Sequence, residues 1–275
     1  MKIAICLVGQ LRTFSDVYES LISNLVKPLQ ESSYVSQVDI FIYGTTFTKS
    51  DYINHFDKIR YSSKLEIDKP GAETIIKKCP HITKVELKTF SDNTINYLMT
   101  KINLDNKPNF QEILCTKSIQ YHKTDRFYKL FYLGMSQHYN NMNAFRKVDN
   151  SYDIIIRTRP DMRYLNKKLS YYVIDYIKKE RKMYSICLTQ KNELWDQIFF
   201  GKATAMKLLY DNFDSKMIYF CKGFMNGSQR RSENMLQNFV REFSKKYKKK
   251  INWLNLKYQH DYTRDTSRGT TLNTR

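Results

Sequence analysis

Short apolar runs alternate with stretches of helical periodicity along most of the chain. Residues 2–8 form a compact apolar run, residues 18–29 repeat apolar side chains at helical spacing, and residues 38–43 form a second apolar run. Because strand, helix and strand follow one another with short connections, this part predicts a βαβ unit. Ser15 is expected to cap the helix, and Gly44 to end the second strand.

The same alternation continues towards the C-terminus. Further strands are predicted over residues 64–67, 82–87, 152–158, 183–188, 197–200 and 252–256. Helices are predicted over residues 73–78, 117–147, 203–212 and 233–247. This order is typical of an α/β domain with a mostly parallel sheet flanked by helices. We assign residues 1–255 to that domain and residues 256–275 to a basic, flexible tail, since the composition after Tyr262 turns to Thr, Arg, Ser, Gly and Asn.

Composition supports one globular domain. The 275 residues are 41% hydrophobic, which is enough for one large core. No segment approaches the roughly 20 consecutive apolar residues that span a bilayer, and the first residues lack the features of a signal peptide. The five cysteines show neither metal-binding nor disulfide spacing, so they are expected to be small buried hydrophobic residues. A cytoplasmic protein is therefore expected.

The net charge of +19 indicates an anionic partner or environment. This positive charge suits four kinds of partner: a diphosphate-bearing substrate, an acidic glycan, an anionic membrane surface or nucleic acid. The one dense basic run, residues 245–250, is typical of a solvated helix end. Since the sequence has no aromatic-basic RNA motif and no helix-turn-helix, a nucleic-acid-binding protein without turnover ranks below an enzyme.

Polar residues directly after buried strands are the first candidates for a site, because ligands of open α/β sheets bind beyond the carboxyl ends of the strands. Gly9, Gln10 and Arg12 follow the first predicted strand. Glycine allows close backbone approach there, and Arg12 can bind a phosphate or a carboxylate. A tight turn with a surface arginine explains the same residues equally well.

A second candidate cluster follows the apolar run Ile154–Ile156. Pro160 favours an extended conformation for Arg159, so Arg157, Arg159 and Asp161 are expected to share one face. Two guanidinium groups and a carboxylate at a strand end can hold a diphosphate together with a divalent cation. The alternative is a structural Arg–Asp salt bridge.

Three further residues are weaker candidates. Asp196, before a short apolar run, is suited to binding sugar hydroxyls or acting as a base, and capping a turn is its alternative role. Glu233 follows Ser232 at a predicted helix start, where it either favours the helix dipole or faces an acceptor. His260 is a candidate metal ligand.

Several enzyme classes lose support because their motifs are absent. The sequence contains no GxxxxGK[ST] loop, no GxGxxG after a strand, no GxSxG elbow and no kinase motif set. ATPases, Rossmann oxidoreductases, α/β-hydrolases and protein kinases are therefore disfavoured, and so is transfer of sulfate from a nucleotide.

Three segments resemble a group of GT-A-type glycosyltransferases from giant viruses, bacteria and algae. They are GQLRTF (Gly9–Phe14), YDIIIRTRPDM (Tyr152–Met162) and WDQIFFGKA (Trp195–Ala203). The resemblance covers roughly residues 1–247, and RTRPD is its most specific element. It implies transfer of a sugar from a nucleotide-sugar donor to a glycan or glycoprotein acceptor, in the host cytoplasm if the protein is viral.

The resemblance also implies roles for the candidate residues. GT-A enzymes hold a divalent metal and the donor diphosphate at a short acidic motif, usually Asp-x-Asp. Asp161 matches the surviving acid, with Mn²⁺ or Mg²⁺ completed by water or His260, while Arg159 stands where the family carries Asp. The residues expected to bind the donor are Gly9, Gln10, Arg12, Arg157 and Arg159. Asp196 and Glu233 are alternatives for the base that an inverting enzyme requires and a retaining enzyme does not.

Overall fold

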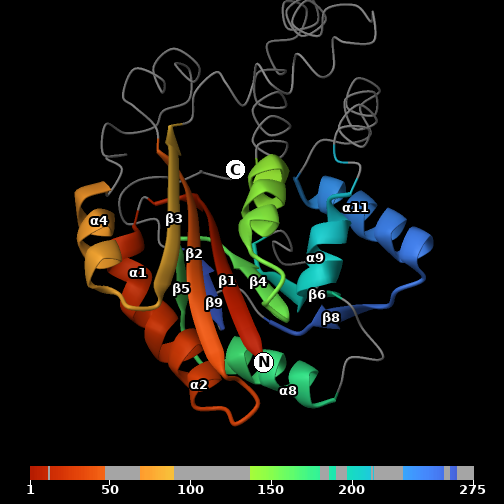
Figure 1. Cartoon of the computed structure of the whole chain (residues 1–275), viewed down its shortest axis with the longest axis horizontal. Coiled ribbons are helices and arrows are strands. Elements are labelled where there is room, and N and C mark those ends of the chain that lie inside the picture. Colours follow the sequence, from red (N-terminus) through yellow and green to blue (C-terminus); the bar gives the residue numbers. More distant parts are fainter. Residues whose placement is uncertain are drawn as a thin grey trace, which may run out of the picture.

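A seven-stranded sheet forms the centre of the molecule (Figure 1). The computed structural model describes residues 1–11, 13–46, 69–89, 137–179, 186–189, 197–211, 213, 232–256 and 261–264. The strands lie in the order β3-β2-β1-β4-β7-β6-β8. Their bounds are β1 Lys2–Gln10, β2 Gln37–Thr46, β3 Ile82–Thr89, β4 Ile154–Thr158, β6 Ile186–Thr189, β7 Phe199–Lys202 and β8 Ile251–Leu254.

The sheet is mostly parallel. β7 runs antiparallel to both of its neighbours, β4 and β6, and the other pairings are parallel. Two successive reversals restore the direction, so β6 and β8 point the same way as β4. The carboxyl ends of β1, β2, β3 and β4 therefore lie along one edge of the sheet, where the fold positions a ligand.

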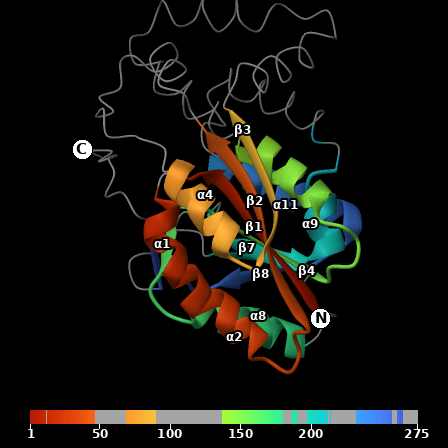
Figure 2. The ribbon, with the colours of Figure 1, turned by 60° about the vertical axis from the view of Figure 1, so that its left-hand side comes forward.

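Helices cover both faces of this sheet (Figure 2). One layer consists of α1 (Phe14–Leu21), the π-helix η1 (Ile22–Val26), α2 (Lys27–Gln30), α4 (Lys69–Lys78) and α8 (Lys168–Lys178). The other contains the helix of residues 137–147, α9 (Ala203–Leu209) and α11 (Ser232–Tyr247). The predicted α/β architecture, a mostly parallel sheet flanked by helices, is confirmed.

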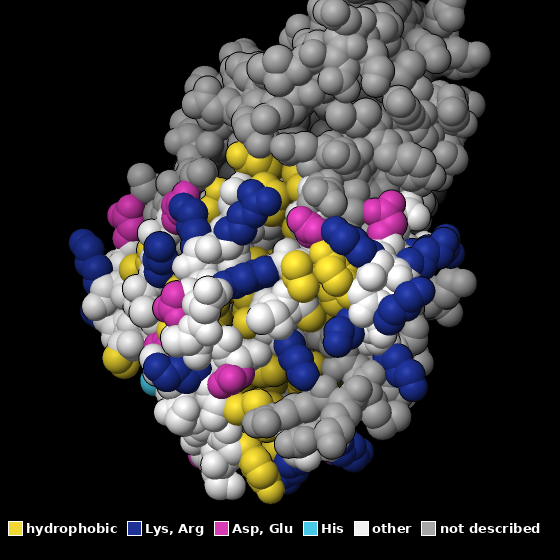
Figure 3. Space-filling view, turned by 45° about the vertical axis from the view of Figure 1, so that its right-hand side comes forward, with side chains coloured by type: hydrophobic (Ala, Val, Ile, Leu, Met, Phe, Trp, Pro, Cys, Tyr) yellow, Lys and Arg dark blue, Asp and Glu magenta, His cyan; other side chains and the backbone are white. Residues whose placement is uncertain are grey.

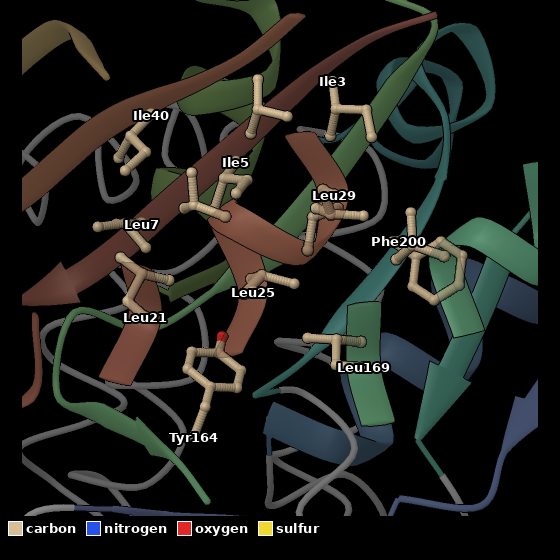
Figure 4. Close-up of a cluster of buried hydrophobic side chains, with 14 of the residues drawn as sticks. Ile3, Ile5, Leu7, Leu21, Leu25, Leu29, Ile40, Tyr164, Leu169 and Phe200 are labelled. Carbon is tan, nitrogen blue, oxygen red and sulfur yellow. The ribbon is translucent and has the colours of Figure 1, made fainter. Parts of the chain in front are cut away.

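Strict alternation along β1 divides the core into two clusters. Ile3, Ile5 and Leu7 pack with the α1–α8 layer, and this cluster includes Leu25 and Leu169 (Figure 4). The intervening residues Ala4, Cys6 and Val8 face the layer of α9 and α11. Burial of β1 on both faces explains its continuous apolar sequence, which is typical of a central parallel strand.

A two-stranded antiparallel ribbon lies beside α1. It consists of β5 (Met162–Tyr164) and β9 (Tyr262–Arg264). The Arg163 guanidinium donates to the Asp16 carbonyl at 3.0 Å, which ties β5 to α1. Asp261 is buried and accepts hydrogen bonds from Asn166 at 3.1 Å and Lys168 at 2.8 Å. Neither strand was predicted, and residues 261–264 belong to the segment assigned to the tail.

Several predicted boundaries differ from the structure. α1 begins at Phe14 with Thr13 at its N-cap, so the prediction that Ser15 caps the helix is wrong. Gly44 does not end β2, because it pairs with Gly9 on one side and Leu87 on the other. Helix α8 was not predicted. The strand predicted at residues 64–67 and the helical stretch before residue 137 lie outside the described residues.

The cysteines that the structure describes agree with the prediction of buried, unreactive thiols. Cys6, Cys79 and Cys187 are free and buried. Burial raises the pKa of the Cys6 thiol to about 12, although the positive charges of Arg157 and Lys207 act in the opposite direction. Among the described residues, no helix is both long enough and apolar enough to cross a bilayer.

Candidate functional site

The two predicted segments with the strongest site signals lie together at the carboxyl edge of the sheet. β1 and β4 pair in parallel from Ile3 with Ile154 to Leu7 with Thr158, so their C-terminal turns are neighbours. Gly9 has a φ of 138°, a conformation that side chains other than glycine rarely adopt. A Cβ atom at Gly9 would lie 3.6 Å from Cδ of Pro160. The end of β1 therefore lies beside the turn after β4.

Arg159 and Asp161 form a two-point ion pair in the turn after β4. Nε of Arg159 donates to Oδ1 of Asp161 at 2.7 Å, and Nη2 donates to Oδ2 at 2.8 Å. The Asp161 side chain is fully buried, while that of Arg159 is 14% exposed. Planar two-point pairing holds both groups in a fixed geometry. The Arg–Asp salt bridge considered as an alternative is thus present.

Arg157 is fully buried and points into the layer of the 137–147 helix. Its Nε donates to Oδ1 of Asn141 at 3.0 Å, and its Nη1 donates to the Gln197 carbonyl at 2.9 Å. The guanidinium also lies 5.8 Å from the centre of the Phe199 ring. Strand β4 ends at Thr158, so the extended alternation predicted through Asp161 is wrong. Arg157 binds Asn141 and Gln197, apart from the Arg159–Asp161 pair with which it was predicted to share a face.

A chain of buried hydrogen bonds continues from Arg157. Arginine only donates, so the Asn141 amide oxygen faces Arg157 and its nitrogen donates to the Tyr210 hydroxyl at 3.1 Å. That hydroxyl lies 2.9 Å from Nδ1 of His138. The Tyr210 hydroxyl thus accepts from Asn141 and also lies within hydrogen-bond distance of the His138 ring. The chain joins β4, the 137–147 helix and the end of α9.

Sequence reasoning did not identify Asn141, His138 and Tyr210 as members of this network. Both His138 and Asn141 lie in the helix predicted over residues 117–147. The available signal was this pair of polar residues, three positions apart among apolar ones, because buried polar side chains need partners. Their partners are distant in sequence and were not predictable from spacing.

Two further buried polar atoms lie on segments that border this edge. Thr13, at the N-cap of α1, makes no capping hydrogen bond, and its hydroxyl has no partner among the described residues. The side-chain oxygen of Gln197 is likewise buried and without a partner within that part of the chain. An unpaired buried polar atom costs free energy unless a ligand or water satisfies it. The helix N-terminus beside Thr13 also favours an anion.

The remaining predicted residues are described only in part. Gln10 ends β1, and Glu233 is the second residue of α11, but the side chains of both are outside the description. Arg12, Asp196 and His260 lie outside the described residues. Asp261, the residue after His260, binds Asn166 and Lys168. Both of these partners follow Asp161 by a few residues in the sequence. The roles assigned to these residues stay predictions.

No group of three or more His, Cys, Asp or Glu side chains in the described part of the chain is arranged to hold a metal ion. At Asp161 both carboxylate oxygens already accept from Arg159. A cation at this carboxylate would therefore compete with a guanidinium for the same oxygens. Binding of Mn²⁺ or Mg²⁺ stays a prediction.

Comparison with known proteins gives distant likenesses. No protein-family model and no curated protein matches the chain. Mouse xyloside xylosyltransferase 1 in its apo form is 8% identical, covers 92% of this chain and 85% of its own, and has a TM-score of 0.42. The 4-diphosphocytidyl-2C-methyl-D-erythritol synthase of Anaerococcus prevotii is 8% identical, covers 94% and 89%, and has a TM-score of 0.39. At these scores neither structure assigns a family or an activity.

Proposed function

We propose that the chain is a glycosyltransferase that moves a sugar from a nucleoside-diphosphate sugar to a glycan or protein acceptor. The observation that carries the proposal is the close approach of Gly9 to Pro160, where an added Cβ atom would lie 3.6 Å from Cδ of the proline. The end of β1 therefore lies beside the turn that holds Arg159 and Asp161, at the carboxyl ends of adjacent strands. Ligands of open α/β sheets bind in this position.

The donor diphosphate is assigned to Arg12 and Arg159, with the backbone at Gly9 and Gln10 in close approach. The N-terminus of α1 adds a favourable dipole, and the Thr13 hydroxyl adds a donor. Arg157 takes a different part from the one expected from sequence. It fixes Asn141 and the backbone at Gln197 from behind the site while adding buried positive charge. Fixed positive charge stabilises a leaving diphosphate.

The transfer breaks the bond between the anomeric carbon and the diphosphate oxygen, and the electron pair leaves with the nucleoside diphosphate. A new bond forms from the anomeric carbon to the acceptor hydroxyl oxygen. The hydroxyl proton passes to a carboxylate or to the leaving diphosphate. Asp196 is assigned to the sugar or acceptor, and Glu233 is the second candidate base. The proposed transfer involves no metal, because both oxygens of Asp161 already accept hydrogen bonds from Arg159.

Thermal-shift measurements with UDP-, GDP-, CMP- and dTDP-sugars test this function. A donor that binds only the folded chain raises its stability by about 2.7 kcal/mol at a hundredfold excess over the dissociation constant. We expect one nucleotide class to do so, with and without Mn²⁺, and Arg159→Gln to weaken the shift. Absence of stabilisation by all four classes would contradict the proposal.

Asp161→Asn tests the acidic position. Turnover is expected to fall strongly. Because Asp161 is fully buried and accepts two hydrogen bonds from Arg159, we also expect a loss of about 1–3 kcal/mol in stability. Activity is therefore compared well below the melting temperature, with Arg163→Gln in the following strand β5 as a control. Full activity of Asp161→Asn would show that this carboxylate is not needed for transfer, and undiminished wild-type activity in excess EDTA would exclude the Mn²⁺ or Mg²⁺ requirement predicted from the sequence.

A further inference from the structure

A second charged region lies at the other end of the sheet order, beside the edge strand β8. Residues 241–250, which cover the last part of α11 and the turn before β8, contain six lysines and arginines and one acid, Glu242. All six basic residues are exposed: Arg241, Lys245, Lys246, Lys248, Lys249 and Lys250. We call these six residues the α11 basic patch. Figure 3 shows lysine and arginine side chains gathered on this side of the molecule.

Most of the charge in the α11 basic patch is uncompensated. Asp211 binds Lys246 at 2.7 Å and accepts from the Tyr247 hydroxyl at 2.8 Å. Among the described residues, no acidic side chain pairs with Lys245 or with Lys248–Lys250. Favourable interaction with the helix dipole accounts for Lys245 and Lys246 in the last turn, since the effect fades within one turn. It does not account for the three lysines that follow the helix.

The chemistry of the patch favours a lipid surface over nucleic acid. Five of the six cations are lysines, which act as hydrated point charges, whereas arginine is the residue suited to two-point phosphate recognition. The neighbouring aromatic ring, Tyr247, is only partly exposed and has the Lys246 amine 5.1 Å from its centre, so it offers no open stacking platform for bases. Leu208, 40% exposed, lies in the last turn of α9, where its carbonyl accepts from the amide of Asp211 at 3.0 Å.

The topology also separates the patch from the candidate site. β8 is parallel to β6 and points the same way as β4, so the start of β8 lies at the amino edge of the sheet. Lys248–Lys250 immediately precede that start, whereas Arg159 and Asp161 follow the end of β4. A surface bound through the patch therefore leaves the carboxyl edge accessible.

We propose that the α11 basic patch docks the protein on an anionic membrane surface. Lysines within reach of anionic headgroups each strengthen partitioning by about fivefold, and clusters of four to eight are typical of such contacts. This docking is independent of donor binding, so the proposed transferase activity and the membrane contact stand or fall separately.

The test is co-sedimentation of the whole chain with vesicles at physiological ionic strength. We expect binding to phosphatidylcholine vesicles containing about 30% phosphatidylserine and none to phosphatidylcholine alone. The triple variant Lys245→Glu, Lys249→Glu, Lys250→Glu should lose more than about a hundredfold in partitioning, since neutralising the three lysines alone accounts for that factor. These side chains are exposed, so an unchanged melting temperature is expected, and a Gln triple at the same positions repeats the test without charge reversal.

A matched control removes the same charge at the opposite edge of the sheet. Lys77 and Lys78 end α4, and Lys84 lies on the edge strand β3; all three are exposed. The triple Glu variant of these residues should keep vesicle binding within about fivefold of wild type. Equal loss in both triples would show a non-specific effect of net charge. Absence of vesicle binding, or binding to duplex DNA or heparin that the vesicles do not compete for, would overturn the proposal.

Discussion

The two faces of the central sheet bury different kinds of side chain. On the face of α1 and α8, β1 contributes Ile3, Ile5 and Leu7 to an almost wholly apolar cluster. On the face of α9 and α11, the cluster surrounds the fully buried Arg157 and its hydrogen-bonded partners. Apolar packing contributes stability roughly in proportion to area. A buried charge costs free energy, which hydrogen-bond partners such as Asn141 and the Gln197 carbonyl offset.

Truncation on the apolar face should have the largest effect. Ile5 is fully buried between β1 and the α1 layer, so Ile5→Ala is expected to lower the free energy of unfolding by about 2–5 kcal/mol. Urea unfolding measures the loss. Leu208→Ala, at an exposed position, should stay within about 0.5 kcal/mol of wild type. A loss below about 1 kcal/mol at Ile5 would mean that this face is loosely packed.

A paired comparison of two tyrosines separates the faces more finely. Tyr210→Phe removes the hydroxyl that joins Asn141 to His138 and should cost about 1–3 kcal/mol. Tyr164→Phe, on the apolar face, removes one hydrogen bond of 2.6 Å to Thr158 and should cost about 0.5–1.5 kcal/mol. Thermal unfolding of both variants measures the two losses of stability, and the loss for Tyr210→Phe should be the larger. Equal losses would show that the Tyr210 network is not tighter than a single buried pair.

Gly9→Ala tests the end of β1, where the strand passes beyond the two core clusters. The added methyl group would be in ordinary contact with Pro160, so no clash is expected. The positive φ alone should cost about 1–2 kcal/mol. Chemical unfolding gives the cost, and the donor-induced thermal shift should fall as the turn relaxes. An unchanged stability would show that the backbone adjusts its φ without penalty.

The smallest effect is expected at alkaline pH, from one thiol on each face. Burial raises the pKa of both Cys6 and Cys187 from 9.0 to about 12. A raised folded-state pKa leaves stability unaffected below pH 9 and lowers it as pH rises towards 12, because only the unfolded chain then loses the proton. Each thiol should contribute a loss of about 1 kcal/mol by pH 10.

Urea unfolding of Cys6→Ala and Cys187→Ala, measured from pH 8.5 to 10.5, checks this effect. Each variant should show a shallower alkaline decline than wild type. The positive charges of Arg157 and Lys207 act to lower the Cys6 pKa. If salt does not screen these charges inside the core, raising its concentration should leave the alkaline decline at Cys6 nearly unchanged. Parallel declines in wild type and both variants would contradict the raised pKa values.

Sequence patterns predicted the elements that are buried on both faces, and they failed where partners come from far along the chain. The runs at residues 2–8 and 152–158 were recognisable because central parallel strands are apolar throughout. Helix α8 was missed although Leu169, Val173 and Ile177 repeat every four residues, because tyrosine, serine and aspartate side chains lie between them. β9 was missed because its pairing with β5 bridges about a hundred residues.

The candidate site was predictable in position but not in detail. Strand-end arginines and Asp161 marked the carboxyl edge correctly. The identity of Arg157 as an internal anchor depends on Asn141, 16 residues away, and on Gln197, 40 residues away. Spacing along one strand carries no information about such contacts. Charge at a strand end therefore indicates where to look, while burial decides which charge can meet a ligand.

The pairing of β1 with β4 has a consequence for synthesis on the ribosome. Ile3 is in register with Ile154, so about 150 further residues must be synthesised before β4, the second neighbour of β1, can pair with it. Until then, β1 presents an unpaired edge on the side that β4 later covers, the kind of intermediate that self-associates. Every incomplete chain that stops before Pro160 also lacks the junction with Gly9. We therefore expect nascent chains to gain protease resistance and nucleotide binding late, and in that order.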